Sequence, residues 1–127
     1  MATPTTRSFR LTEAAAGPVS VAVTTAGGRR PVVVLSGPLP DIPGMRDRLA
    51  RAGLAVVSFE PSPDGLEVVL DGIGRGVLGV ESDSYALVEP GPAGSLQVAR
   101  GAGAVRVAAV TVPGVDGLVQ WLAAHHV

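Results

Sequence analysis

The feature that most constrains the fold is an unbroken run of large aliphatic residues, Val32-Val33-Val34-Leu35. A strand that has no polar position on either face has to be covered on both of its sides. Similar apolar strand segments recur at 54–59 and 85–88, and after each of them the spacing of apolar residues becomes helical. We therefore expect the middle of the chain to consist of short strand–helix units.

The expected helices are defined by their apolar stripes and by the residues at their ends. Asp41 and Pro43 are suited to begin the first helix, and Gly53 is placed to end it. The four stripes are Ile42, Met45, Leu49 and Ala52; then Leu66, Val69, Leu70 and Ile73 after Ser62-Pro63; then Leu96, Val98 and Ala99 after Pro92; and finally Leu118, Val119 and Leu122 in a helix from about Val115. Between the last two helices we expect a strand at 105–112.

The N-terminal segment has a different pattern. Apolar and polar residues alternate over 8–13 and again at Val19, Val21 and Val23, which is typical of half-buried antiparallel strands. Residues 1–6 are expected to be frayed. We predict one α/β domain spanning residues 1–127, a three-layer αβα sandwich with a mostly parallel sheet and antiparallel N-terminal strands.

Composition excludes several classes of protein. The chain has no cysteine, so disulfides, thiolate nucleophiles and cysteine-ligated zinc are not expected. The ten basic residues are all arginine and are spread along a chain of net charge −1, which does not favour nucleic-acid binding. No apolar stretch approaches the roughly 20 residues that span a bilayer, so we expect a cytoplasmic protein. The absence of lysine and asparagine is typical of a high-GC bacterium.

The order of elements resembles the α/β-hydrolase fold, and three phrases carry the resemblance over roughly residues 8–126. Residues 31–37, Pro-Val-Val-Val-Leu-Ser-Gly, resemble the strand and turn that hold part of the oxyanion hole in dienelactone-hydrolase and acyl-thioesterase-like members. Residues 48–57 resemble the next helix and strand, and residues 74–83 resemble the segment before the nucleophile strand. The resemblance implies a minimal, truncated member of that fold.

The same resemblance implies that the serine-hydrolase machinery is missing. The family places its nucleophile in G-x-S-x-G after a strand, and matching the strand before this motif puts Glu89 at the first glycine, Gly91 at the serine and Ala93 at the last glycine. Pro92 then falls on the residue whose N–H would donate to the oxyanion, and proline has no N–H. The chain ends before the strands that supply the family's acid and histidine, so Ser-His-Asp hydrolysis is not expected.

Other candidate site residues are few. Ser95 is the hydroxyl nearest to the expected elbow, with an ordinary helix-surface serine as the alternative. His125 and His126 are the only histidines; no further ligands converge on them in the sequence, so no metal or cofactor is expected. The glycines from 72 to 79 follow a helix and precede a strand, which is the reverse of a dinucleotide-binding loop.

Three carboxylates follow strands and could act together. Glu60, Glu89 and Asp116 would lie near the carboxyl ends of parallel strands, where ligands bind in open α/β sheets. Two acids held close together can serve as an acid–base pair, although loop acids also commonly serve solubility and helix N-termini. The predicted ligand crevice is lined by Ser36, Gly37, Glu60, Glu89, Gly91 and Pro92.

The expected edge of the sheet points to self-association. The strand at 105–112 is apolar with one charge, Arg106, and Trp121 lies on the helix behind it, so we expect a homodimer through this edge strand and the last helix. The alternative is a monomer whose last helix covers the edge. Three functions stay open: a non-hydrolytic protein that binds a small acyl or aromatic ligand or a protein; an enzyme of carboxylate chemistry or residual esterase or thioesterase activity; and an oligomeric scaffold.

Overall fold

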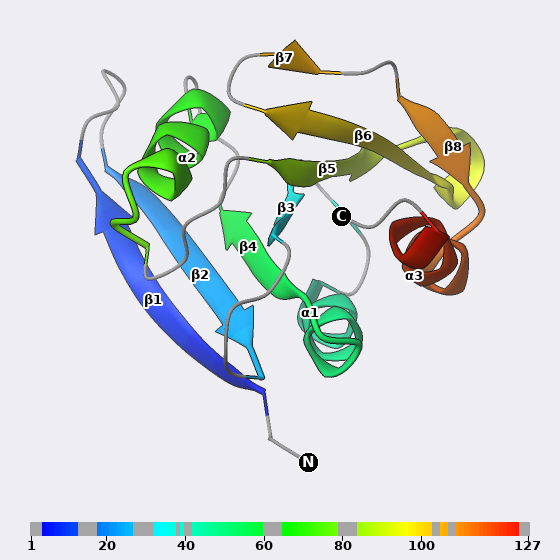
Figure 1. Cartoon of the computed structure of the whole chain (residues 1–127), viewed down its shortest axis with the longest axis horizontal. Coiled ribbons are helices and arrows are strands. Elements are labelled where there is room, and N and C mark those ends of the chain that lie inside the picture. The colour runs from blue at the N-terminus through cyan, green and yellow to red at the C-terminus, as the bar shows by residue number, and fades with distance from the viewer. Residues whose placement is uncertain are drawn as a thin grey trace.

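The strands form one mixed sheet with helices on both of its faces (Figure 1). A computed structural model describes residues 4–12, 18–26, 32–37, 39, 42–59, 65–78, 84–102, 105–106 and 109–124. Within this part of the chain the elements are β1 (Thr5–Leu11), β2 (Val19–Thr25), β3 (Val32–Leu35), α1 (Ile42–Arg51), β4 (Ala55–Phe59), α2 (Gly65–Gly74), β5 (Tyr85–Pro90), the 3₁₀ turn η1 (Pro92–Gly94), β6 (Leu96–Ala102), β7 (Val105–Arg106), β8 (Val110–Val112) and α3 (Val115–Ala124).

The strand order is β1-β2-β4-β3-β5-β6-β7, and β8 pairs with β6 beside β7. Parallel pairing joins β3 to β4 and to β5. The other five pairings, β1 with β2, β2 with β4, and β6 with β5, β7 and β8, are antiparallel. A small α/β fold with antiparallel N-terminal strands is confirmed, whereas the prediction of a mostly parallel sheet is wrong for the described residues.

The error arises at a single segment, the predicted helix after Pro92. The structure has a strand there, β6, which returns along β5 as the second arm of a hairpin. Leu96 and Val98 are buried on one face and Gln97 between them is half-buried, which is a period of two rather than of 3.6. The predicted strand at 105–112 is found as β7 and β8, but it runs antiparallel to β6 because no helix separates them.

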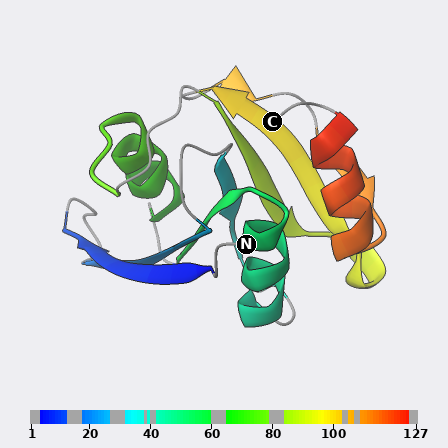
Figure 2. The ribbon, with the colours of Figure 1, turned by 60° about the horizontal axis from the view of Figure 1, so that its bottom comes forward.

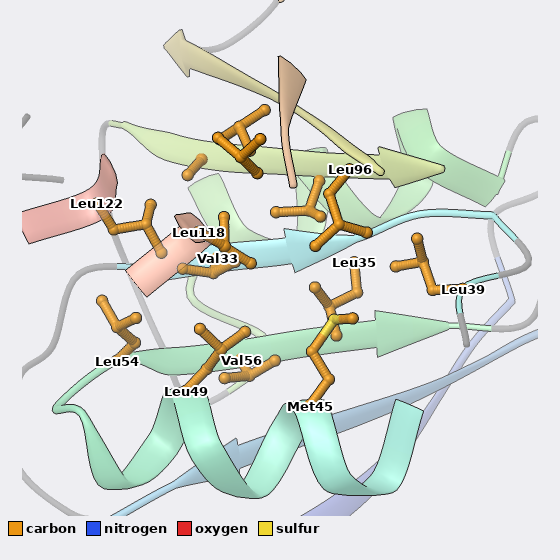
Figure 3. Packing of buried hydrophobic residues seen from close by; sticks show 14 of the residues in the cluster. Val33, Leu35, Leu39, Met45, Leu49, Leu54, Val56, Leu96, Leu118 and Leu122 are labelled. Atoms are coloured by element: carbon orange, nitrogen blue, oxygen red, sulfur yellow. The ribbon is translucent and has the colours of Figure 1, made fainter. Parts of the chain in front are cut away.

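The sheet separates two apolar cores, one against each face. On one face α2 contributes Val69 and Ile73, and the chain after it contributes Leu78, against the valines of β2 and alternate residues of β3, β4 and β5. On the other face α1 and α3, whose ribbons Figure 2 shows, contribute Met45, Leu49, Leu118 and Leu122, whose side chains are labelled in Figure 3. All four residues of β3 are at most 2% exposed, which confirms that this run is covered on both sides.

The three helices follow the predicted stripes, except that Ala52 lies in the turn after α1 and is exposed. Helix α1 ends where expected, because Gly53 takes a φ of 94° and its N–H donates to the Ala50 carbonyl at 3.0 Å, while the Leu54 N–H donates to the Leu49 carbonyl at 3.1 Å. This pair of bonds is a Schellman motif, which satisfies carbonyls at the helix end. Leu49 and Leu118 lie at the centre of their helix faces and are completely buried.

Two smaller expectations about the chain ends need correction or limits. Strand β1 begins at Thr5, so Thr5 and Thr6, which we expected to be frayed, belong to the sheet, and the Thr6 hydroxyl is 2.9 Å from that of Thr24. Trp121, which we expected to contribute to a dimer interface, is half-buried and packs against the core beneath α1 and α3. Residues 1–3 and the two histidines at 125 and 126 lie outside the described residues.

Candidate functional site

The turn that follows β5 is the place where the resemblance expects a nucleophile, and it is a tight hairpin turn. The Ser95 N–H donates to the Pro92 carbonyl at 3.1 Å, and the two residues between them both have positive φ, 55° at Ala93 and 77° at Gly94. These are the features of a type I′ turn, whose twist matches that of a two-stranded hairpin. The chain therefore leaves β5 directly into an antiparallel strand, and not into the helix that a nucleophile elbow requires.

Gly91 is fixed by close packing inside this turn. Its N–H donates to the Ser95 carbonyl at 2.9 Å. A Cβ at position 91 would lie 2.6 Å from the Ser95 Oγ, which is closer than real Cβ atoms approach, and 3.2 Å from the Ser95 carbonyl oxygen, which is a tight contact. Any side chain here, a serine included, would have to displace Ser95. The glycine is thus explained by the geometry of the hairpin.

Ser95 is engaged within the same turn. Its Oγ donates to the Pro92 carbonyl at 2.6 Å, so the hydroxyl proton is held by a backbone acceptor and not by a general base. The residue is half-buried and precedes β6, so its predicted place in the first turn of a helix is wrong. In this arrangement Ser95 closes the turn that Pro92 begins.

The end of β3, which was predicted to supply an oxyanion donor, packs against the end of β5. The Ser36 N–H donates to the Val88 carbonyl at 2.8 Å, as a continuation of the parallel ladder. A Cβ at Gly37 would lie 3.0 Å from the Pro90 Cδ, so the loop after β3 and the last residue of β5 are in close contact. Of the predicted crevice, Ser36 and Gly37 thus pack against the end of β5, just before Gly91 and Pro92 in the sequence.

The predicted carboxylates are not gathered at one place. Glu89 is exposed and alternates with the buried Val88, so its side chain lies on the α2 side of the sheet. Asp116 is exposed in the first turn of α3, on the opposite side, where it forms an ion pair with Arg48 of α1. Glu60 lies outside the described residues. Glu89 and Asp116 therefore lie on opposite sides of the sheet and are not brought together.

The ion pair between Arg48 and Asp116 has a structural role. It joins the last turn of α1 to the first turn of α3, two helices that share one core. The acid also lies at a helix N-terminus, where the helix dipole favours a negative charge. Asp116 is thus accounted for without catalysis.

Two kinds of feature are absent from the described part of the chain, groups of side chains that could hold a metal ion and helices that could span a membrane. No group of three or more His, Cys, Asp or Glu side chains gathers there in a way that could hold a metal ion. None of its helices is long and apolar enough to cross a membrane.

A feature that the sequence analysis did not single out is the outer edge of β1. The Arg7 guanidinium lies over the Phe9 ring, with 5.4 Å between its carbon and the ring centroid. Both residues lie on the α2 side of β1, and Phe9 packs against the core on that side. Their i, i+2 spacing in an alternating strand is the signal that could have indicated this contact.

Comparison of the chain with protein-family models, with curated proteins and with solved structures finds no match. The resemblance to dienelactone hydrolases and acyl thioesterases accordingly stays a prediction.

Proposed function

We propose that this chain is a non-hydrolytic interaction protein, which acts by binding another protein chain and not by transforming a substrate. The observation that carries the proposal is the type I′ hairpin at Pro92–Ser95, which stands where an α/β hydrolase would need a strand-to-helix turn bearing a serine.

Three properties of this hairpin argue against nucleophilic catalysis. Position 91 has no room for a side chain, because the Ser95 Oγ occupies the space next to it. The Ser95 hydroxyl donates a hydrogen bond to the Pro92 carbonyl, whereas a nucleophilic serine donates its hydrogen bond to a general base. Pro92, which follows the nucleophile position, has no N–H to offer to an oxyanion.

The proposal that the chain binds another protein rests on the outer strands of the sheet. An edge strand presents backbone N–H and C=O groups to which an extended segment of another protein can add. In the described part of the chain β1 is such a strand: it has one neighbour, β2, and five of its seven residues are exposed. Strand addition uses main-chain hydrogen bonds and needs no enclosed cavity.

We further propose that the chain is a minimal, three-layer relative of the α/β-hydrolase fold up to the end of β5. Its support is the order of the elements. Two antiparallel strands are followed by three parallel strands, β3, β4 and β5, which are separated in the sequence by α1 and α2, and helices lie on both faces of the sheet. Beyond β5 the two differ, since the chain continues as antiparallel strands.

The test is the intact mass of the protein after exposure to a broad fluorophosphonate probe, together with turnover of ester and thioester substrates. We expect neither an adduct nor turnover above the level of a Ser95→Ala variant, which removes the hydroxyl of the turn while leaving the backbone. A stoichiometric adduct that maps to Ser95 or Ser36 and disappears in the matching alanine variant would overturn the proposal.

A further inference from the structure

The two edges of the sheet differ in how suitable they are for pairing. At one edge β7 and β8 have two and three residues, and their ladders on β6 are out of register with each other by one residue. Short strands and a break in register are usual devices that protect an edge, and Pro113 follows β8 directly.

The edge formed by β1 carries none of these devices within the strand. All seven of its residues pair with β2 in one continuous register, from Thr5 opposite Thr25 to Leu11 opposite Val19. Pro4 lies before the first paired residue, and no proline follows in the strand. Figure 1 and Figure 2 show β1 as the outermost strand on its side of the sheet. Its backbone is therefore a continuous template for pairing.

The charges on β1 do not block this template. Arg7 lies over the Phe9 ring on the α2 side, so its guanidinium is directed to that face of the sheet and not along the edge. Arg10 points to the other side of the sheet, together with Ser8 and Thr6. The net charge of the chain, −1, gives two copies little reason to repel each other at long range.

We propose that β1 pairs antiparallel with β1 of a second copy of this chain, so that the two sheets become one continuous sheet. The two copies are related by a two-fold axis that passes between the two Ser8 residues. In an antiparallel pair, two residues that stand directly opposite each other point to the same face of the sheet. A two-fold axis perpendicular to the sheet therefore has to pass between one residue and the same residue of the second copy. With the axis at Ser8 all seven residues of β1 pair.

The Ser8 axis also gives the best side-chain complementarity. It sets each Arg7 opposite the partner's Phe9, so that both cation–π contacts are continued across the interface. An axis at Arg7 would set two arginines opposite each other, and an axis at Phe9 would leave Thr5 and Thr6 without strand partners. Because the pattern is self-complementary, it favours a second copy of this chain as the partner.

The size of the interface sets the expected strength. Two seven-residue strands bury less surface than the roughly 1,200–2,000 Å² of stable interfaces, so we expect a reversible dimer with a dissociation constant on the order of 1–100 µM. This inference extends the proposed function by naming the partner, but it does not depend on the probe experiment above, which reports on hydrolysis alone.

Cysteine trapping tests the axis directly, because the chain has no cysteine of its own. In a Ser8→Cys variant the two thiols would face each other across the axis with Cβ atoms about 4.5–5.5 Å apart, close enough for a disulfide after small adjustment. Arg10→Cys is the matched control, since residue 10 is exposed on the same strand and face but lies roughly 13 Å from its own copy, at about 3.3 Å per residue. We expect Ser8→Cys to give a covalent dimer under mild oxidation at least about tenfold faster than Arg10→Cys.

Sedimentation velocity over roughly 1–300 µM supplies the second measurement, on the wild-type chain and on charge variants. Ser8→Asp and Ser8→Lys should each be monomeric, because like charges meet on the axis, whereas an equimolar mixture should dimerise again. Circular dichroism should show both variants folded, since Ser8 is exposed.

Two results would overturn the proposal. One is a wild-type monomer throughout this range with equal cross-linking of Ser8→Cys and Arg10→Cys. The other is a dimer that is trapped by Thr111→Cys in β8 and not by Ser8→Cys, which would place the interface at the edge predicted from the sequence at 105–112.

Discussion

Tyr85 lies over Gly101, and this contact makes a sharp prediction about stability. The two residues are direct partners in the β5–β6 ladder. A Cβ at position 101 would lie 2.5 Å from the Cε2 and Cζ atoms of the Tyr85 ring and 2.6 Å from its Oη. Carbon atoms in contact are usually about 3.5–4.0 Å apart, so in Gly101→Ala the ring has to move by roughly 1 Å.

The ring has little space in which to move. Tyr85 is 3% exposed and belongs to the core on the α2 side of the sheet, together with Leu87 and Ile73. Overpacking of a core typically costs about 1–3 kcal/mol, and the reduced entropy of the unfolded alanine chain offsets about 0.5–1 kcal/mol. We expect Gly101→Ala to lower the free energy of unfolding by about 1–2 kcal/mol, and the melting temperature by about 4–8 °C.

The assay is urea and thermal unfolding followed by circular dichroism, with two comparisons. Gly74→Ala is the control, because a Cβ there meets nothing within 4 Å, and it should leave the protein equally stable or slightly more stable. In a Tyr85→Leu background, Gly101→Ala should cost about 1 kcal/mol less, since the clashing ring is absent. The same loss in both backgrounds, or no loss at all, would refute the reasoning.

Two further predictions concern the hairpin turn and the exposed ion pair. Ala93 adopts a φ of 55° and a ψ of 37°, a conformation that asparagine tolerates and valine does not. Ala93→Asn should therefore raise the free energy of unfolding by about 0.5–1 kcal/mol, and Ala93→Val should lower it. Thermal melts that shift in the same direction for both variants would contradict the assigned turn. The side chains of Arg48 and Asp116 are 54% and 77% exposed, so a double-mutant cycle with alanine should give a coupling free energy of no more than about 0.5 kcal/mol, which weakens in high salt. A coupling several times larger would mean that the packing of the two helices depends on this contact.

Much of the fold could be predicted from the spacing of apolar residues. Met45 and Leu49 in α1, and Leu118 and Leu122 in α3, face the core as their spacing indicates. Such stripes are long enough to distinguish a period of 3.6 from a period of two. The run at 32–35 likewise identified the strand that is covered on both faces.

The segment after β5 could not be predicted in the same way, for a physical reason. Leu96, Val98 and Ala99 satisfy both a short helix and a strand, so the choice depends on the turn before them. In that turn Ala93 adopts a left-handed conformation at a position that Asn, Asp or Gly normally takes, so the sequence of the turn does not indicate a hairpin. The preceding strand–helix units then favoured another helix.

The candidate site was affected by the same ambiguity. The position of Gly91 next to a strand end was predicted correctly, but its close contact with Ser95 depends on the hairpin and is invisible in the sequence. Glu89 and Asp116 were predicted to share one edge of a parallel sheet. The antiparallel return of β6 removes that arrangement, and the alternation along β5 places Glu89 on the opposite side from Asp116.

Strand β3 has a consequence for the way the molecule unfolds. Among the described strands it alone joins β4, and through it the β1–β2 hairpin, to the hairpin of β5 and β6. Both of its pairings are parallel and connect residues distant in sequence, which form slowly compared with the local hairpins. The outer strands can therefore open individually by fraying, whereas the amide protons of Val33 and Val34 become accessible to solvent deuterium only when the parallel pairings of β3 at the centre of the sheet break.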